Sequence, residues 1–185
     1  MLSLNNLKLR AMNDVDLEMI LNWRNSEHVR KYSLTDHIIK LEDHKKWFQG
    51  THNNPTCEWL VAEYKNKPVG VVSITEIKEQ DGTCTWGMYV DEEYSNFGIG
   101  VLMEIHAIDR MINHHGIRKI WGQALESNRI ILTHKRFGFE EEGVLKEHVF
   151  RNGGYESIIL IGLFSKKWID KRKQMVEMLN LEDNY

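Results

Sequence analysis

The sequence has little of what defines several large classes of protein. Among 185 residues it holds two cysteines, Cys57 and Cys84, and two prolines. Each lies in a strand-like apolar run rather than at the spacing of metal ligands, so we expect both to be reduced core residues. No apolar stretch approaches the roughly 18 residues of a membrane span, and residues 1–8 lack the apolar core of a signal peptide. We therefore expect a cytoplasmic protein without a membrane partner.

The chain also carries no excess of positive charge. The chain has 24 basic and 27 acidic residues and a formal net charge of -3. Without a basic field there is no driving force for binding nucleic acid, which we exclude as a partner. Neither repeats nor low-complexity segments interrupt the chain, and its length fits one domain over residues 1–185.

Hydrophobic periodicity predicts an α+β (mixed α/β) fold. A helix between the strands at 83–90 and 118–125 makes these two strands parallel, whereas the other connections are turns that favour antiparallel pairing. The predicted strands are 7–12, 58–64, 67–75, 83–90, 118–125, 142–150 and 155–163. The predicted helices are 13–25, 40–50, 98–115, a short one after Asn128, and 165–180.

A glycine-containing segment, Tyr94–Gly100, stands where the 83–90 strand leads into the 98–115 helix. Gly98 and Gly100 permit a tight turn and close approach of a ligand to N–H groups that have no partner at a helix start. Such a turn binds phosphate, or it only connects two elements. The sequence lacks the G-x-x-x-x-G-K-[ST] motif and a third glycine spaced for a dinucleotide fold.

Further along lie Glu126-Ser127-Asn128 and then Gly138-Phe139. Together with the glycine segment they resemble the acetyl-CoA motifs of the GNAT (GCN5-related) N-acetyltransferase superfamily. The resemblance implies a central twisted, mostly antiparallel sheet with one splayed parallel strand pair and helices on both faces. It also implies acetyl-CoA as co-substrate. The residues that the resemblance assigns to acetyl-CoA are Met88, Val90, Ser95, Asn96, Phe97, Gly98, Ile99, Gly100, Asn128 and His134.

Two departures from the superfamily pattern stand out. Ser95 occupies a position where relatives usually have Gln or Arg, so a side-chain contact to the cofactor is lost while the backbone donors remain. The interval from Asn128 to Gly138 is one residue shorter than usual. This shortening leaves the assignment of residues inside that helix uncertain by one position.

The acceptor side is indicated by W-R-N at Trp23-Arg24-Asn25 and by L-x-x-H-x-x-W-F around His44. These segments resemble the branch that acetylates nucleotide-linked amino sugars, as in the pseudaminic-acid pathway. The implied partner is such a sugar, for example a UDP-4-amino-4,6-dideoxy sugar. The implied acceptor residues are Trp23, Arg24, Asn25, Arg30 and His44. The competing interpretation is a solvated helix end and a surface histidine.

Two other functions stay open. The E-G-x-L pattern at 142–145 and the G-L ending at 162–163 are shared with enzymes that acetylate ribosomal-protein N-termini. Loss of the usual residue at Ser95 is a modest hint of a non-catalytic acyl-CoA-binding module. The sequence predicts a monomer or a homodimer and does not distinguish them.

The expected chemistry is attack of a neutral amine on a thioester. The resemblance assigns the backbone N–H of Val90 to the oxyanion and places His134 where relatives protonate the leaving thiolate. We expect Glu126 to be the base, directly or through water, and His134 can either donate a proton or accept one. Alternatively, Glu126 only caps a helix and His134 is a surface residue. We predict no metal site, because the acidic and histidine side chains of the 98–115 helix show no three-ligand spacing.

Overall fold

One seven-stranded sheet runs through the computed structural model, which describes residues 2–183. The strand order is β1-β2-β3-β4-β5-β7-β6. Only β4 and β5 pair in parallel, and all other neighbours are antiparallel. The strands are β1 (Leu7–Ala11), β2 (Glu58–Tyr64), β3 (Lys67–Lys78), β4 (Thr83–Val90), β5 (Lys119–Leu125), β6 (Glu140–Arg151) and β7 (Gly154–Phe164). The predicted fold class is confirmed.

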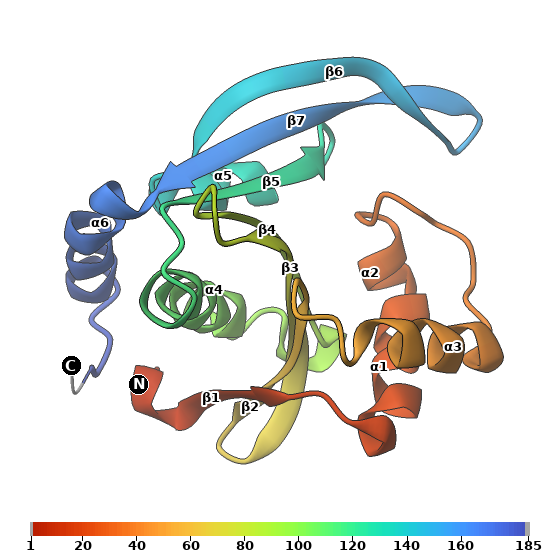
Figure 1. Ribbon diagram of the computed structural model, residues 1–185, viewed down its shortest axis with the longest axis horizontal. Helices are drawn as coiled ribbons and strands as arrows, with labels where there is room; N and C mark the ends of the chain where they lie inside the picture. The colour runs from red at the N-terminus through yellow and green to blue at the C-terminus, as the bar shows by residue number, and fades with distance from the viewer. Residues whose placement is uncertain (1, 184–185) are drawn as a thin grey trace.

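Helices lie on both sides of this sheet, with α4 and α6 on one side and α1, α2 and α3 on the other (Figure 1). They are α1 (Leu17–Asn25), α2 (Glu27–Arg30), α3 (Leu41–Thr51), α4 (Ile99–Asp109), α5 (Ile130–Arg136) and α6 (Ser165–Met178). No helix within residues 2–183 combines the length and the apolar character that crossing a bilayer requires.

Two helix predictions differ from the structure at their ends. The predicted 98–115 helix is α-helical only to Asp109 and continues as a π-helical turn, η4 (Arg110–His114). The predicted 13–25 helix begins as a 3-10 turn, η2 (Asp14–Asp16), before α1.

Each side of the sheet has its own core. The side with α4 buries that helix almost all round, which fits its nearly continuous apolar sequence. The other side packs Ile20 of α1 and Phe48 of α3 against Val61 and Val71. Cys84 is free and fully buried, as expected, and Cys57 is free and half-buried.

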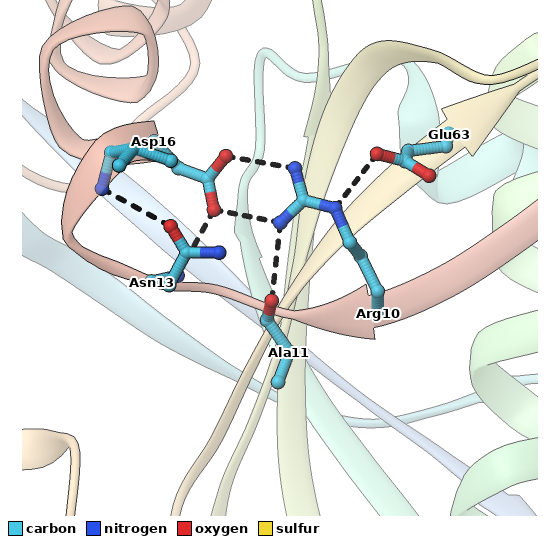
Figure 2. A network of polar contacts seen from close by, with 6 residues as sticks. Arg10, Ala11, Asn13, Asp16 and Glu63 are labelled. Carbon is cyan, nitrogen blue, oxygen red and sulfur yellow. Dashed lines mark hydrogen bonds and ion pairs between the residues drawn. The ribbon is translucent and has the colours of Figure 1, made fainter.

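A polar network fixes the entry to α1 (Figure 2). The guanidinium of Arg10 binds both carboxylate oxygens of Asp16, at 2.7 and 2.8 Å, and its Nε donates to Glu63 at 2.7 Å. Asp16 also accepts from the N–H of Asn13 at 3.0 Å. Strands β1 and β2 are thereby connected to the start of the first helix.

The parallel pair is short. Thr83–Thr85 of β4 pair with Lys119–Trp121 of β5, and beyond these residues the two strands separate. β5 keeps its full length because it pairs with β7 as far as Leu125. The residues of β4 from Trp86 onward therefore have a strand partner on one edge only. We call this open edge the splay.

Candidate active site

The glycine segment leads from β4 into α4 and presents free N–H groups. Gly98 has a left-handed φ of 73° and caps α4, and its carbonyl accepts from Val101 at 3.1 Å. Within the described residues, the N–H groups of Gly98, Ile99 and Gly100 donate to no acceptor. Those donors and the positive end of the helix dipole suit a pyrophosphate.

Side chains of this segment leave the N–H groups accessible. The Ser95 hydroxyl turns back to the carbonyl of Glu92 at 2.9 Å, and Phe97 is exposed. A Cβ added at Gly100 would meet Val90 and Met88 at ordinary distances of 3.5 and 3.6 Å. Protein packing therefore does not require a glycine at position 100, whereas a ligand lying on the backbone would.

The N–H groups of Met88 and Val90 point into the splay. In an antiparallel pair, successive residues direct their N–H groups to opposite edges of the strand. Asp91 donates to Val69 of β3 at 2.9 Å, so Val90 and Met88 face the opposite edge. β5 has left β4 by this point, and both donors lack a strand partner. This is the geometry that the predicted oxyanion role of Val90 requires.

His134 is buried, so the alternative of a surface histidine is wrong. Its Nδ1 lies 2.7 Å from Oε1 of Glu104, a fully buried residue of α4. Burial raises the pKa of Glu104, and the hydrogen bond with His134 acts in the opposite direction. Sequence reasoning missed Glu104, although one carboxylate inside the apolar run 101–108 is a visible signal.

Glu126 follows β5 directly, and its side chain is exposed. It does not cap α5, because Asn128 Oδ1 accepts the N–H of Ile130 at 3.1 Å. Asn128 therefore has a structural contact of its own in addition to its predicted place beside acetyl-CoA. Glu156 of β7 accepts from the Ser127 N–H at 3.1 Å and from its hydroxyl.

On the other side of the sheet, three arginines from distant parts of the chain form a cluster. Arg24 donates from Nη2 to Thr35, while its Nη1 is buried and has no partner among residues 2–183. Arg30 donates to the backbone carbonyls of Asn25 and Asp36. Arg151, at the end of β6, donates from Nη2 to the carbonyl of Arg30 at 3.2 Å, and its Nε and Nη1 are buried with no partner in the described part of the chain. We call Arg24, Arg30 and Arg151 the arginine cluster.

No carboxylate neutralises the arginine cluster within the part of the chain that the structure describes. Burial lowers the pKa of Arg24, Tyr89 opposes this, and the positive charges of Arg30 and Arg151 add to the lowering. Burial, and then the charge of Arg24, lower the pKa of His44. Nε2 of His44 is also buried, with no hydrogen-bond partner within residues 2–183. The cluster is a set of donors without an anion.

Three predicted acceptor residues therefore gather here, since Arg24, Arg30 and His44 belong to one neighbourhood. The other two predicted acceptor residues, Asn25 and Trp23, make structural contacts. The Asn25 amide holds the loop before α3 by donating to the carbonyl of Ile39 at 2.8 Å and accepting its N–H at 2.9 Å. Trp23 packs against the core beneath α1. Arg151 was missed, because nothing in the sequence places residue 151 beside residue 30.

Glu58, His114 and His115 bring three possible metal ligands within 4.8 Å of one another. This grouping was not foreseen, because Glu58 lies on a different element. Arg110 binds both carboxylate oxygens of Glu58, and His115 Nε2 lies 2.9 Å from one of them. A guanidinium in contact with both oxygens already provides the positive charge that a metal ion would bring.

Comparison with known proteins agrees with this arrangement. Residues 6–140 match the family described as "Acetyltransferase (GNAT) domain". Spermidine N(1)-acetyltransferase of Vibrio cholerae serotype O1 is 22% identical over 167 residues, which are 89% of this chain and 96% of that protein. Acetyltransferase PseH of Campylobacter jejuni is 22% identical over 94 residues, or 51% of this chain and 58% of that protein.

Among solved structures, the chain resembles the crystal structure of spermidine N-acetyltransferase from Vibrio cholerae in complex with CoA and spermine. The TM-score is 0.84 at 22% identity, over 89% of this chain and 99% of that chain. At this level of identity the similarity shows a common fold, including the expected arrangement of sheet and helices.

Proposed function

The chain belongs to the GNAT family of acetyltransferases, and from this premise we propose that it acetylates the primary amine of an anionic acceptor, a nucleotide-linked amino sugar. The enzyme class and the co-substrate follow from the family. The protein is an N-acetyltransferase that uses acetyl-CoA. The identity of the acceptor is the part that we propose.

The observation that carries the proposal is the uncompensated charge of the arginine cluster. A cation that is partly removed from water and has no carboxylate partner costs free energy, and a ligand that supplies negative charge lowers that cost. Guanidinium groups bind phosphate oxygens through paired N–H donors, and Arg24 and Arg151 both have such donors unused. The pyrophosphate of a nucleotide-linked sugar offers the matching acceptors.

A polyamine acceptor is the main alternative, because relatives that cover most of this chain are spermidine acetyltransferases. Spermidine is a polycation, and its binding site needs carboxylates. The arginine cluster would repel it, and the groups that act on the charge of Arg24 include no carboxylate. The match to PseH favours the sugar branch but covers only half of the chain.

We propose that the pyrophosphate of CoA lies on the free N–H groups of Gly98, Ile99 and Gly100. The thioester then extends along the splay, where the N–H of Val90 can donate to the carbonyl oxygen as it gains charge. The remaining cofactor contacts, from Met88, Ser95, Asn96, Phe97 and Asn128, stay predictions.

Proton transfer needs an acceptor for the amine proton and a donor for the leaving thiolate. Glu126, exposed at the end of β5, is the proposed base, directly or through water. His134 is the proposed donor to sulfur. A cytoplasmic location, a single domain over residues 1–185 and a monomeric or homodimeric state remain predictions.

A thiol-release assay with acetyl-CoA tests the acceptor class. UDP-, dTDP- and GDP-linked amino sugars should be turned over, and spermidine, spermine and ribosomal-protein N-terminal peptides should be poor acceptors. Preference for a polyamine or a peptide would overturn the proposed acceptor but not the enzyme class. Thiol release with none of them, in a protein that binds CoA, would favour the non-catalytic module.

Variants of the arginine cluster test its role. Arg24→Gln and Arg151→Gln should each raise the KM for the nucleotide sugar about 10-fold or more, because each removes a charge-assisted hydrogen bond. The KM for acetyl-CoA should not change. Lys45→Gln, which removes an exposed positive charge from α3, is the matched control. An unchanged acceptor KM in both arginine variants would contradict the proposal.

A further inference from the structure

Glu104 is an unusual residue for its position. Its side chain is fully buried, and the α4 residues around it in the sequence, Leu102, Met103 and Ile105, are apolar core residues. A carboxylate in such a place costs free energy unless its charge is compensated. No arginine or lysine compensates it, because His134 is its one hydrogen-bond partner among the described residues. Oε2 of Glu104 is buried, and none of the residues that the structure describes forms a hydrogen bond with it.

The contact fixes the His134 ring in one orientation. Nδ1 lies 2.7 Å from Glu104 Oε1, the ring of Trp86 meets the imidazole edge-on with 5.2 Å between centroids, and Phe139 lies 5.7 Å away. Nε2 has no hydrogen-bond partner among the described residues, and the side chain keeps 10% exposure. One ring nitrogen is therefore held by the carboxylate, and the other is left for a ligand.

Trp86 locates the ring relative to the splay. Thr85 is the last residue of β4 that pairs with β5, and Trp86 is the next one. The imidazole that packs on Trp86 therefore lies at the point where the strands separate. The N–H groups of Met88 and Val90 open on the same strand edge two and four residues later. Nε2 can thus face the region where these N–H groups would hold a thioester.

We propose that Glu104 is a positioning residue of the acetyl transfer, which holds His134 with Nδ1 protonated and stabilises its imidazolium so that Nε2 delivers a proton to the leaving sulfur. The inference rests on the proposed role of His134. When the amine nitrogen has bonded to the carbonyl carbon, the C–S bond breaks and its electron pair goes to sulfur. Sulfur takes the Nε2 proton, and the amine proton lost to Glu126 or water balances the step.

The carboxylate should change how the rate depends on pH. A carboxylate in contact with Nδ1 holds the ring in one orientation, so its removal should change how well Nε2 donates to sulfur at each pH. Trp86 and Phe139 carry no charge, and Lys135, the next residue on α5, pairs with Glu141 at 3.2 Å. Glu104 is therefore the charged group whose removal should shift the alkaline side of the pH–rate profile.

The first test compares kcat between pH 5 and 10 for wild type, Glu104→Gln, His134→Gln and the double variant. Glu104→Gln should lower kcat by at least about 10-fold at neutral pH and alter the alkaline limb of the pH–rate profile. CoA affinity, measured by calorimetry, should not change. The double variant should be no slower than His134→Gln, because Glu104 acts through the histidine.

Asp109→Asn is the matched control. Asp109 is another largely buried carboxylate of α4, but its partners are Trp168 and Arg172 of α6, away from His134. Its replacement should lower the melting temperature and leave the pH–rate profile in place. A Glu104→Gln enzyme with the wild-type profile, or losses that multiply in the double variant, would overturn the inference. Wild-type activity of His134→Gln would instead remove the proposed role of His134 itself.

If the Glu104→Gln variant does not fold, NMR of the wild-type protein still tests the inference. Nitrogen NMR of histidine side chains, assigned by the signals missing from His134→Gln, should show neutral His134 with its proton on Nδ1. A neutral ring with the proton on Nε2 would mean that Glu104 is itself protonated and donates to Nδ1. That result would exclude the carboxylate as the stabilising charge.

Discussion

Gly98 and Gly100 stand two residues apart but are glycines for different physical reasons. Gly98 needs its left-handed φ of 73°, and a Cβ there would lie 2.7 Å from Leu2 Cδ1. Gly100 has no left-handed φ, and its added Cβ would make ordinary contacts. Gly98 is needed for the backbone conformation, whereas Gly100 leaves room for a ligand.

Alanine substitutions should separate these two roles. Gly98→Ala should lower the free energy of unfolding by about 1–2 kcal/mol, because the left-handed conformation and the contact with Leu2 both oppose a side chain. Gly100→Ala should leave it unchanged or raise it by up to about 1 kcal/mol, since alanine favours the helix. Denaturant unfolding of the two variants measures the difference.

Gly100→Ala should nevertheless weaken CoA binding, because the methyl group stands between the ligand and the free N–H groups of α4. Calorimetry with CoA measures this directly. Loss of affinity in a variant that is as stable as wild type would assign Gly100 to the ligand. Unchanged affinity would place the pyrophosphate elsewhere.

At the scale of single residues, the sequence predicted local geometry and missed contacts between distant segments. The glycine segment and Val90 could be placed because a strand, a turn and a helix follow one another directly. The partners Glu104 and His134 are 30 residues apart, and Arg151 and Arg30 are 121 apart. Such pairs depend on the sheet order, which periodicity does not determine.

At the scale of elements, Asp16 connects the first strand to the first helix (Figure 2). Burial acts to raise the pKa of Asp16, but hydrogen bonds from Arg10 and the Asn13 N–H prevail, and the pKa lies below its usual value. A group whose pKa is lower in the folded state stabilises the fold above its unfolded pKa. That contribution is lost as the pH falls through the folded pKa.

Asp16→Asn should therefore destabilise the protein by about 2 kcal/mol at pH 7, through the loss of charge-assisted hydrogen bonds. The difference from wild type should shrink below about pH 4, where the unfolded carboxyl is protonated and the folded one begins to be. Denaturant unfolding at pH 7 and pH 3 measures both. Asp14→Asn, at an exposed neighbour in the same turn, should change little at either pH.

The predicted ends of helices and strands agree with the structure where a local sequence pattern defines them. β2 and β4 begin and end as predicted, because apolar runs between turn residues define short strands. The end of α4 differs because Arg110–His114 wind as a π-helix. In that wider turn, residues five apart come together, so Arg110 and His115 both reach Glu58 on β2. The π-helical end of this helix therefore depends on a contact with Glu58, which is distant in the sequence.

At the scale of the whole molecule, the β6–β7 hairpin, near the C-terminal end of the sequence, lies beside the N-terminal helices. β7 pairs along the full length of β5, and the hairpin extends past it toward α2 (Figure 1). Arg151 at the end of β6 there contacts Arg30 of α2. The proposed acceptor site therefore combines residues from both ends of the chain, whereas the glycine segment belongs to one strand–helix unit.

Because the two proposed sites are separate, we expect their ligands to raise the free energy of unfolding additively. The glycine segment and the arginine cluster share no residue, so CoA and UDP, the latter standing for the nucleotide part of the acceptor, should bind together. A ligand at 100 times its Kd stabilises by about 2.7 kcal/mol, or about 5–10 °C in melting temperature for a chain of this size. The two ligands together should give about the sum of their separate shifts.

The Arg24→Gln, Arg151→Gln double variant should keep the shift caused by CoA and lose the shift caused by UDP, because only the second ligand depends on the unpartnered guanidinium donors. Spermine should give no shift in wild type, since the cluster repels a polycation. Stabilisation by spermine in place of UDP would move the acceptor to the polyamines. An undiminished UDP shift in the double variant would show that the nucleotide binds away from the arginine cluster, and the uncompensated charge would then need another anion.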